Sequence, residues 1–231
     1  MGLPADELEL QIDEVMDVDE WARYAALMGL CGIGDTYILG GLQHNIRFFI
    51  PEDGRGVTAL PWDMDFVFSE SASSVLRPPT AGNIRKVFSI PRVERLYWGH
   101  VNDLINTTFH EDYMTPWLQH YGSVVGQSFS SQSSYIRSRR AAVARRLPAD
   151  VPFKVTTNDG GPLEVSTPVA QIEGEGWIDI RGFRIAGEAE PLQTRWLDDV
   201  KWQVTIPLLP GSNSISLEAF DFQGDTSIHT P

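Results

Sequence analysis

The feature that most constrains this chain is a change of sequence pattern close to residue 150. Before it, apolar residues recur at helical spacing around one short pair of extended runs. After it, short β-type runs alternate with turns rich in Gly, Pro, Asn and Asp. Pro148 and Pro152 lie at the change, and a helix cannot continue through them. We therefore predict two domains, residues 1–148 and 151–231, and an α+β fold class.

The first domain is predicted to be mostly helical, with one β-hairpin. Asp19 is expected to cap its first helix, because a short acidic side chain can accept from the free N–H groups there. The runs 46–50 and 57–60 are expected as strands, since the Asp53-Gly54 pair between them favours a tight turn. The predicted helices cover residues 20–28, 83–89, 91–109, 111–121 and 131–147.

The second domain is predicted to be an antiparallel β-sandwich, because its short strands recur with regular turns. Three tryptophans, Trp177, Trp196 and Trp202, are expected to pack in its core, and stacking on a sugar ring is the alternative. We also expect the sandwich to lack its last edge strand. The predicted strands cover residues 153–156, 169–173, 177–180, 183–185, 202–206 and 214–219.

Composition excludes several classes of protein. The formal net charge of −13 argues against nucleic-acid binding, which requires clustered cations. No apolar run has the roughly 18–20 residues of a membrane span, and the first twenty residues hold no Lys or Arg, unlike a secretory signal. The single cysteine, Cys31, excludes an internal disulfide and is expected to act as a small hydrophobe. The basic run from Arg137 to Arg146 is expected to be a solvated helix face.

The most informative polar residues occur in a fixed order around the predicted hairpin. Asp35 lies in a glycine-flanked loop after a helix, and Asn45 directly precedes the hairpin. The second strand of the hairpin leads to Asp63 and Asp65. Phosphoryl transfer needs a carboxylate near the accepting hydroxyl and oxygen ligands for Mg²⁺. Protein kinases supply these groups in the same chain order, so the order favours a phosphotransferase.

The spacing of the two later acids is compatible with a metal site. Residues two apart in an extended segment point to the same side, so Asp63 and Asp65 could face one divalent cation. The alternative is that Asp35, Asp63 and Asp65 are solvated loop acids or turn caps. The aromatic neighbours Trp62 and Phe66 favour the metal site, because loop acids seldom lie within such an apolar stretch.

These residues resemble one known family. The run Pro61–Phe66 (PWDMDF) is similar to the Pro-Trp-Asp-x-Asp signature of CotH-type kinases, the family of spore coat protein H. The resemblance covers roughly residues 12–145 and implies the C-terminal lobe of an atypical protein kinase. Residues 151–231 resemble the immunoglobulin-like modules that follow such domains. Further similar positions are Trp21, Tyr24, Asp35, His44-Asn45, Phe48-Phe49, Arg95-Leu96-Tyr97 and Tyr113-Met114.

The resemblance implies a role for each candidate residue. Asp35 would be the catalytic acid that positions the acceptor hydroxyl. Asp63 would be the principal metal ligand and Asp65 a second acid beside it, while Asn45 would bind the metal or a nucleotide phosphate. The implied cofactors are Mg²⁺ and ATP, and the implied reaction is phosphate transfer to serine or threonine of a protein substrate, such as a coat or surface protein.

Two departures from the kinase pattern lead us to expect no activity from this chain alone. Ten positions separate Asp35 from Asn45, against about five in the kinase catalytic loop. The inserted residues therefore either change the direction of the Asn45 side chain, or Asn45 has a structural role. No glycine-rich loop is evident, and no lysine precedes Lys86, whereas kinases use a strand lysine on the phosphates. We therefore expect a fragment whose nucleotide-covering lobe is missing and which binds Mg·ATP weakly or not at all.

Two other functions stay open. The first is a non-catalytic coat or cell-surface assembly protein with a degenerate kinase-like domain. The second is a nucleotide-sugar transferase using Asp-x-Asp, which is disfavoured because no βαβ pattern precedes the acids. Localisation is open as well, with a secreted or cell-surface protein favoured if the full-length form has a signal peptide.

Overall fold

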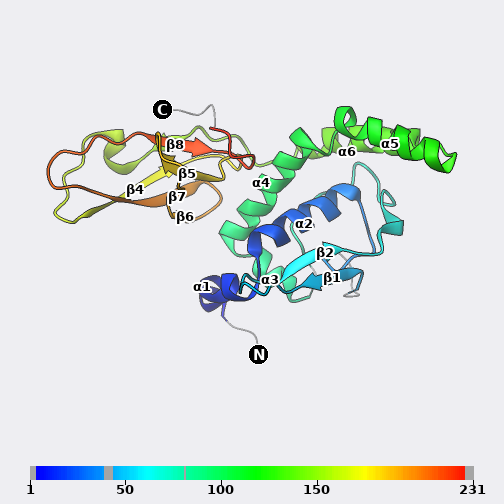
Figure 1. The fold of residues 1–231 in the computed structure, drawn as a ribbon, viewed down its shortest axis with the longest axis horizontal. Coiled ribbons are helices and arrows are strands. Elements are labelled where there is room, and N and C mark those ends of the chain that lie inside the picture. The colour runs from blue at the N-terminus through cyan, green and yellow to red at the C-terminus, as the bar shows by residue number, and fades with distance from the viewer. Residues whose placement is uncertain (1–3, 39–43, 81, 227–231) are drawn as a thin grey trace. The chain divides into compact units, whose positions relative to one another are not determined.

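The structure is a computed structural model that describes residues 4–38, 44–80 and 82–226. The chain divides into two compact units between Leu147 and Pro148. The first unit is helical around one hairpin, and the second consists of antiparallel sheets (Figure 1). Helices and antiparallel sheets together make the fold α+β, as the sequence predicted. Within the described ranges, no helix is both long enough and apolar enough to span a membrane.

The first unit contains six helices and one two-stranded sheet within its described part. All five predicted helices are present with shifted ends, and one further helix, α1, precedes them. The elements are α1 (Ala5–Val15), α2 (Val18–Cys31), β1 (Ile46–Phe49), β2 (Thr58–Pro61), the short 3₁₀ helix η1 (Met64–Phe66), α3 (Ile84–Phe88), α4 (Pro91–Thr107), α5 (Glu111–Val125) and α6 (Ser130–Ala144).

Helix α2 is capped by a different acid from the one predicted. The side chain of Asp17 accepts from the backbone N–H of Glu20 at 3.2 Å, so the helix begins at Val18. The carboxylate of Asp19 instead lies 2.8 Å from Nε2 of the buried His100 on α4. The prediction of Asp19 as the cap was wrong because a long-range partner uses that acid, while Asp17 stands one position before the helix.

The core of the first unit lies chiefly between α2 and α4. Met28 and Leu30 of α2 are buried with Val93 and Tyr97 of α4. Arg139 of α6 is also buried, and it donates to the carbonyl oxygens of Gly29 at 2.7 Å and Ser74 at 2.5 Å. The prediction that the basic run forms a solvated face was therefore wrong at Arg139, whose guanidinium satisfies one carbonyl near the end of α2 and one in the loop that contains Ser74.

The β1–β2 hairpin lies on α2, which fixes its position in the first unit. Its ladder runs from Ile46 opposite Pro61 to Phe49 opposite Thr58. Trp21 of α2 donates its indole N–H to the carbonyl of Val57 at 2.7 Å. The ring of Phe48 lies 5.9 Å from that of Trp21, so one face of the hairpin packs on the helix.

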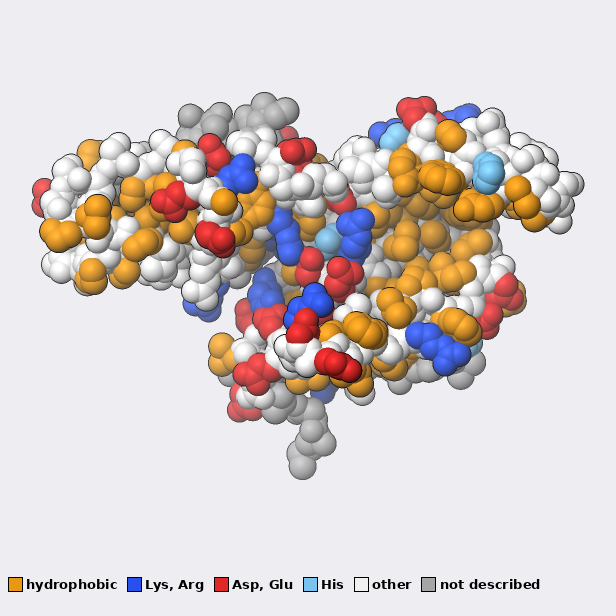
Figure 2. Space-filling view, in the orientation of Figure 1, with side chains coloured by type: hydrophobic (Ala, Val, Ile, Leu, Met, Phe, Trp, Pro, Cys, Tyr) orange, Lys and Arg blue, Asp and Glu red, His pale blue; other side chains and the backbone are white. Residues whose placement is uncertain are grey.

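The other face of the hairpin is open. Phe49, Leu60 and Trp62 are each about half exposed, and the guanidinium of Arg47 lies 4.1 Å from the centre of the Trp62 ring. Helix α5 likewise exposes Tyr113, Trp117 and Tyr121, along with Val124 and Val125. Figure 2 shows hydrophobic side chains gathered on this side of the first unit, between α5 and the hairpin.

The second unit contains two antiparallel sheets that share one core. The strands are β3 (Lys154–Val155), β4 (Val169–Glu175), β5 (Gly182–Ile185), β6 (Thr194–Trp196), β7 (Lys201–Pro207) and β8 (Leu217–Phe220). One sheet has the order β3-β4-β7-β6, and the other pairs β5 with β8. Side chains of both sheets, including Phe183 of β5 and Trp202 of β7, form the core. The predicted missing last strand concerns residues 227–231, which lie outside the described part.

Two strand predictions in the second unit were wrong. Residues 177–180 form a turn, in which Ile180 N–H donates to Trp177 O at 3.2 Å, rather than a strand. Ile178 and Ile180 are nevertheless buried, so their apolar pattern reflects burial of a loop. Strand β6 was missed because it is only three residues long and contains Arg195. A short edge strand carries little periodic signal.

Two of the three tryptophans considered for sugar stacking are core residues. Trp202 is fully buried, and its ring centre lies 4.4 Å from that of Phe183. Trp196 is 9% exposed. Trp177 donates its indole N–H to Pro148 O at 3.0 Å. The predicted core packing is therefore confirmed for Trp196 and Trp202, and the alternative of sugar stacking is excluded for them, because a buried ring offers no face to a ligand.

Candidate active site

Asp35 lies on a short loop that is anchored at both sides. The loop follows Gly32, whose left-handed backbone (φ 60°) ends α2. Thr36 is buried, and its hydroxyl lies 3.4 Å from that of Tyr24 on α2. Burial raises the pKa of Tyr24, and its hydrogen bond to Thr36 opposes this rise, so the phenol is neutral at physiological pH. The Tyr37 ring packs 6.1 Å from Trp21. Asp35 thus lies between the end of α2 and the anchored residues Thr36 and Tyr37.

Asn45 reaches Asp35 despite the ten positions between them. Its side-chain Nδ2 donates to the backbone oxygen of Asp35 at 3.0 Å and to its Oδ2 at 3.1 Å. Asn45 itself has a positive φ of 59°, a conformation that Asn tolerates better than most residues. The intervening residues 39–43 lie outside the described part. The longer spacing therefore leaves the Asn in direct contact with the loop Asp.

His44 is a neighbour of Asp35 to which the sequence patterns gave no role. Its Nε2 lies 2.8 Å from Asp35 Oδ1. Both oxygens of the Asp35 carboxylate therefore face a side chain of the His44-Asn45 pair. The signal in the sequence was the adjacency of His44 to Asn45, which resembled a family motif. No spacing rule predicts that a histidine contacts an aspartate nine positions earlier.

The hairpin carries Asp63 back toward this pair. The ladder ends where Ile46 stands opposite Pro61, so Asn45 and Trp62 are the next residues outward and Asp63 comes directly after Trp62. Beyond Asp63, the N–H of Phe68 donates to Cys31 O at 2.7 Å and that of Glu70 to Gly32 O at 3.0 Å. The segment after Asp63 is thus bonded to the residues that lead into the Asp35 loop.

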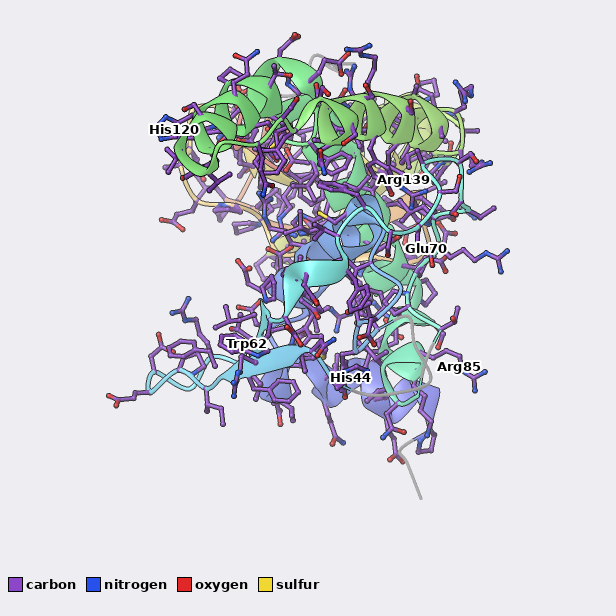
Figure 3. All side chains as sticks on the ribbon, turned by 90° about the vertical axis from the view of Figure 1, so that its right-hand side faces the viewer. His44, Trp62, Glu70, Arg85, His120 and Arg139 are labelled. Carbon is purple, nitrogen blue, oxygen red and sulfur yellow. The ribbon has the colours of Figure 1, made fainter. Side chains whose placement is uncertain are left out.

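Figure 3 shows the labelled His44 and Trp62 beside the hairpin, away from α5 with its labelled His120. His44, which precedes Asn45, and Trp62 therefore both lie on the hairpin side of the first unit. The site is built from three segments that are far apart in the sequence: the loop after α2, the start of β1 and the residues after β2.

The geometry of Asp63 and Asp65 differs from the prediction. Asp63 has a left-handed backbone (φ 55°, ψ 58°), and Asp65 lies in η1. The segment is therefore not extended, and the argument that residues two apart point to one side does not apply. Both acids are exposed, and neither carboxylate has an ion pair or hydrogen bond with another described residue. Among the described residues, none occupies the carboxylates of Asp63 and Asp65, so a ligand could bind there.

The donor atoms fit a magnesium ion only in part. Within the described ranges, no three His, Cys, Asp or Glu side chains lie close enough to hold a metal ion. The predicted set of Asp63, Asp65 and Asn45 contains two acids and one amide. The absence of a cluster of three acidic, His or Cys side chains therefore does not test it, and the metal site stays a prediction. Its donors are all oxygens, and the Oδ1 of Asn45 is not used in the contact with Asp35. Mg²⁺ takes oxygen ligands and keeps several waters, so one or two carboxylates suffice.

Cations that could meet a phosphate are scarce near these acids. The hairpin supplies Arg47, which lies over Trp62, and Arg55, whose Nε lies 2.9 Å from Asp53 Oδ2. No lysine occurs before Lys86 in the sequence. The described site therefore offers Arg47 as its candidate phosphate partner.

Comparison with protein families identifies the first unit. The family model described as CotH kinase protein matches residues 3–146. The chain belongs to the CotH kinase family. The match confirms the resemblance seen in the sequence, and it spans α1 to α6 and every candidate site residue. A search of curated proteins found no match.

Membership of the CotH kinase family makes the first unit a kinase-like domain and gives the second unit no assignment, because the match ends at residue 146. The known family domain therefore contains Asp35, Asn45, Asp63 and Asp65. Protein kinases supply the acid for the hydroxyl and the ligands for the metal in this same chain order.

Proposed function

We propose that the first unit is the phosphotransfer portion of a CotH-type atypical protein kinase. In this proposal Asp35 positions the serine or threonine hydroxyl of a protein substrate. Asp63, with Asp65 and Asn45, would hold Mg²⁺, which when bound neutralises the phosphates of ATP. Arg47 would contact a phosphate.

The contact of Asn45 with Asp35 is the observation that supports this proposal most. It joins the loop acid to the start of the hairpin whose other strand leads to Asp63. The kinase catalytic loop likewise combines an Asp for the hydroxyl with an Asn for the metal. In this chain the same two residue types meet in space, although a longer stretch of sequence separates them.

Asp35 keeps the capacity to accept a substrate proton. Each carboxylate oxygen has two lone pairs, so the hydrogen bond from Asn45 to Oδ2 and the approach of His44 to Oδ1 leave acceptor capacity on both oxygens. The Asp35 side chain is 43% exposed, so a substrate hydroxyl can approach it. The carboxylate would accept a hydrogen bond from that hydroxyl and orient its oxygen toward the γ-phosphate.

Phosphate transfer tests the proposal directly. Expressed together with whatever sequence flanks it in its gene, the first unit should transfer radiolabelled phosphate from Mg·ATP to a serine-rich protein. Asp35→Ala and Asp63→Ala should each lower the rate about a hundredfold or more, because proton handling and charge neutralisation are lost. Asp53→Ala is the matched control, since Asp53 is an exposed acid in the hairpin turn and should not affect the rate. Wild-type rates in either site variant would contradict the assigned role.

The chain by itself should bind Mg·ATP weakly or not at all. Its candidate site has Arg47 but no lysine, and the acids Asp63 and Asp65 face solvent. Isothermal titration calorimetry with Mg·ATP measures this, and a millimolar or weaker dissociation constant is expected. A micromolar constant would contradict the prediction, and Asp63→Ala would then show whether the binding uses this site.

The exposed apolar side chains favour a second candidate, a non-catalytic assembly protein. Phe49, Leu60 and Trp62 on the hairpin and Trp117 and Tyr121 on α5 form more exposed apolar surface than single scattered residues would. A coat or surface protein could dock there. If assembly is the function, Trp117→Ser should impair incorporation of coat or surface proteins in cells, while Asp35→Ala should not. The opposite result favours the kinase.

We also propose that the second unit is an immunoglobulin-like module. Lettering its strands A to F in chain order gives one sheet of order A-B-E-D and a second of C and F. Constant-type immunoglobulin domains have sheets ABED and CFG. This correspondence supports the proposal. A solved structure with a different strand order would contradict it.

A further inference from the structure

We propose that His44 is a positioning residue, which together with Asn45 holds the Asp35 carboxylate in one orientation. The value of that orientation for catalysis rests on the function proposed above. We call this arrangement of the Asp35, His44 and Asn45 side chains the clamp. Its effect on the Asp35 side chain can be measured without any reaction.

The two contacts fix the carboxylate because they involve different oxygens. His44 Nε2 lies 2.8 Å from Oδ1, and Asn45 Nδ2 donates to Oδ2 at 3.1 Å. A carboxylate held by one oxygen can still turn about that contact. When both oxygens are held, the staggered wells available to the Asp35 side chain are reduced to one.

The burial of the histidine nitrogen supports the assignment. Nε2 of His44 is buried, although the whole side chain is 39% exposed, and the Asp35 carboxylate is its polar neighbour among the described residues. It lies close to Oδ1 without the alignment of a straight hydrogen bond, so the contact is a close polar approach. An ionised carboxylate only accepts, so Nε2 carries the proton.

The backbone explains how two consecutive side chains reach one acid. In an extended strand, neighbouring side chains point to opposite faces. Asn45 instead has a left-handed backbone with φ of 59°, which turns the chain between His44 and β1. Asn and Gly adopt this conformation with the least strain. This backbone conformation therefore allows the side chains of His44 and Asn45 to contact the two different oxygens of Asp35.

The clamp would act on the chemistry through Asp35. An aspartate that is 43% exposed and unclamped would sample several rotamers, most of them not directed at an acceptor hydroxyl. Restricting it to one rotamer raises the fraction of time in which the hydroxyl is correctly oriented. A misplaced positioning group can lower the rate about a hundredfold.

The rotamer of Asp35 is the decisive measurement. Coupling constants across its Cα–Cβ bond, measured by NMR in the isotope-labelled full chain, should report one rotamer in the wild type. His44→Ala and His44→Leu should give averaged couplings, and leucine keeps most of the volume without the donor. His44→Gln should restore one rotamer, because its amide N–H can donate to Oδ1. His120→Ala, at an exposed position of α5, is the control and should not change them.

The outcomes separate the clamp from the proposed function. If folded His44→Ala and His44→Leu still show a single Asp35 rotamer, the clamp is contradicted. Loss of the fold in both variants would also contradict it, because His44 would then have a structural role. In the phosphate-transfer assay described above, His44→Leu should lower kcat about tenfold to a hundredfold with an unchanged KM for Mg·ATP, and His44→Gln should recover most of it. Averaged couplings with an unchanged kcat would support the clamp and contradict the role of Asp35.

Discussion

At the scale of single residues, the backbone at Asn45 matters as much as its side chain. Its positive φ allows both His44 and Asn45 to face Asp35, and its amide joins two segments of the site. The sequence showed an Asn directly before the predicted hairpin. The φ value and the partner required the structure.

Replacing Asn45 should separate these two contributions. Asn45→Ala removes both hydrogen bonds to Asp35 and adds the strain of a left-handed alanine, so it should lower the free energy of unfolding by about 2–3 kcal/mol. Asn45→Gly removes the same bonds without the strain, and should be about 1 kcal/mol less destabilising. Urea denaturation of the two variants measures the difference. Equal losses would show that backbone strain contributes nothing here.

The thiol of Cys31 should react slowly in the folded protein. Burial raises its pKa to about 12, and the nearby Arg139 opposes this rise only in part. The folded pKa lies above the unfolded value of about 8.5, so the stability contribution is present below that pH and is lost as pH rises toward 12. Alkylation at pH 8 should be about a thousandfold slower than in urea.

A second measurement checks the sign of this effect. The free energy of unfolding of the wild type should fall more steeply above pH ~9 than that of Cys31→Ala, which has no thiol to ionise in the unfolded state. Parallel pH profiles for the two proteins, or rapid alkylation of the native thiol, would show that the thiol is not protected.

At the scale of elements, the junction of α1, α2 and the hairpin positions the site. The N–H of Val57 donates to Val15 O at 2.8 Å, and Asp17 N–H donates to Val57 O at 3.2 Å. The chain can approach so closely because residue 56 is glycine. A Cβ there would lie 2.2 Å from the carbonyl carbon of Met16 and 2.5 Å from Asp17 N. These are backbone atoms, which cannot move aside as a side chain can.

Gly56→Ala should therefore destabilise the first unit by about 2–3 kcal/mol or more, because a methyl group would force the hairpin away from α2. Gly34→Ala is the matched control. Among the described residues, its Cβ would approach only Glu70 Oε1, at 3.3 Å, which is the end of a flexible side chain, so the loss should be below about 1 kcal/mol. Urea denaturation followed by near-UV circular dichroism compares them. Similar losses for both would contradict the close approach.

At the scale of the whole molecule, each unit has its own hydrophobic core. The first unit's core is built on α2 and α4, and the second unit's on Phe153, Phe183 and Trp202. Trp202 is fully buried, and its ring centre lies 5.7 Å from that of Phe153. Units with separate cores are expected to unfold separately.

Trp202→Ala should unfold the second unit and leave the first intact. Removing a buried tryptophan costs about 3–5 kcal/mol, a large share of the stability of a small domain. Scanning calorimetry should show two transitions in the wild type, and one of them should be lost or moved to a lower temperature in the variant. Trp117→Ala, at an exposed position on α5, should not affect the second unit's transition. A single transition lost as a whole would show that the units fold together.

The sequence by itself determined the elements whose signals are local: the helices at spacing 3.6, the hairpin around Asp53-Gly54, the break at two prolines and the order of Asp35, Asn45 and Asp63. These depend on propensity and period, which act between near neighbours. The sequence could not predict the partner of Asp19, the burial of Arg139 or the exposed, non-extended conformation of Asp63 and Asp65.

Only the tertiary structure decided which side chains meet. His44 contacts Asp35 because a left-handed residue turns the chain, and Arg139 donates to the carbonyl of Gly29, on a helix more than a hundred positions earlier. Such contacts depend on how distant segments pack, and packing is set by the burial of the whole apolar surface rather than by any local pattern. Local rules therefore named the residues of the candidate site, and the packed fold gave them their partners.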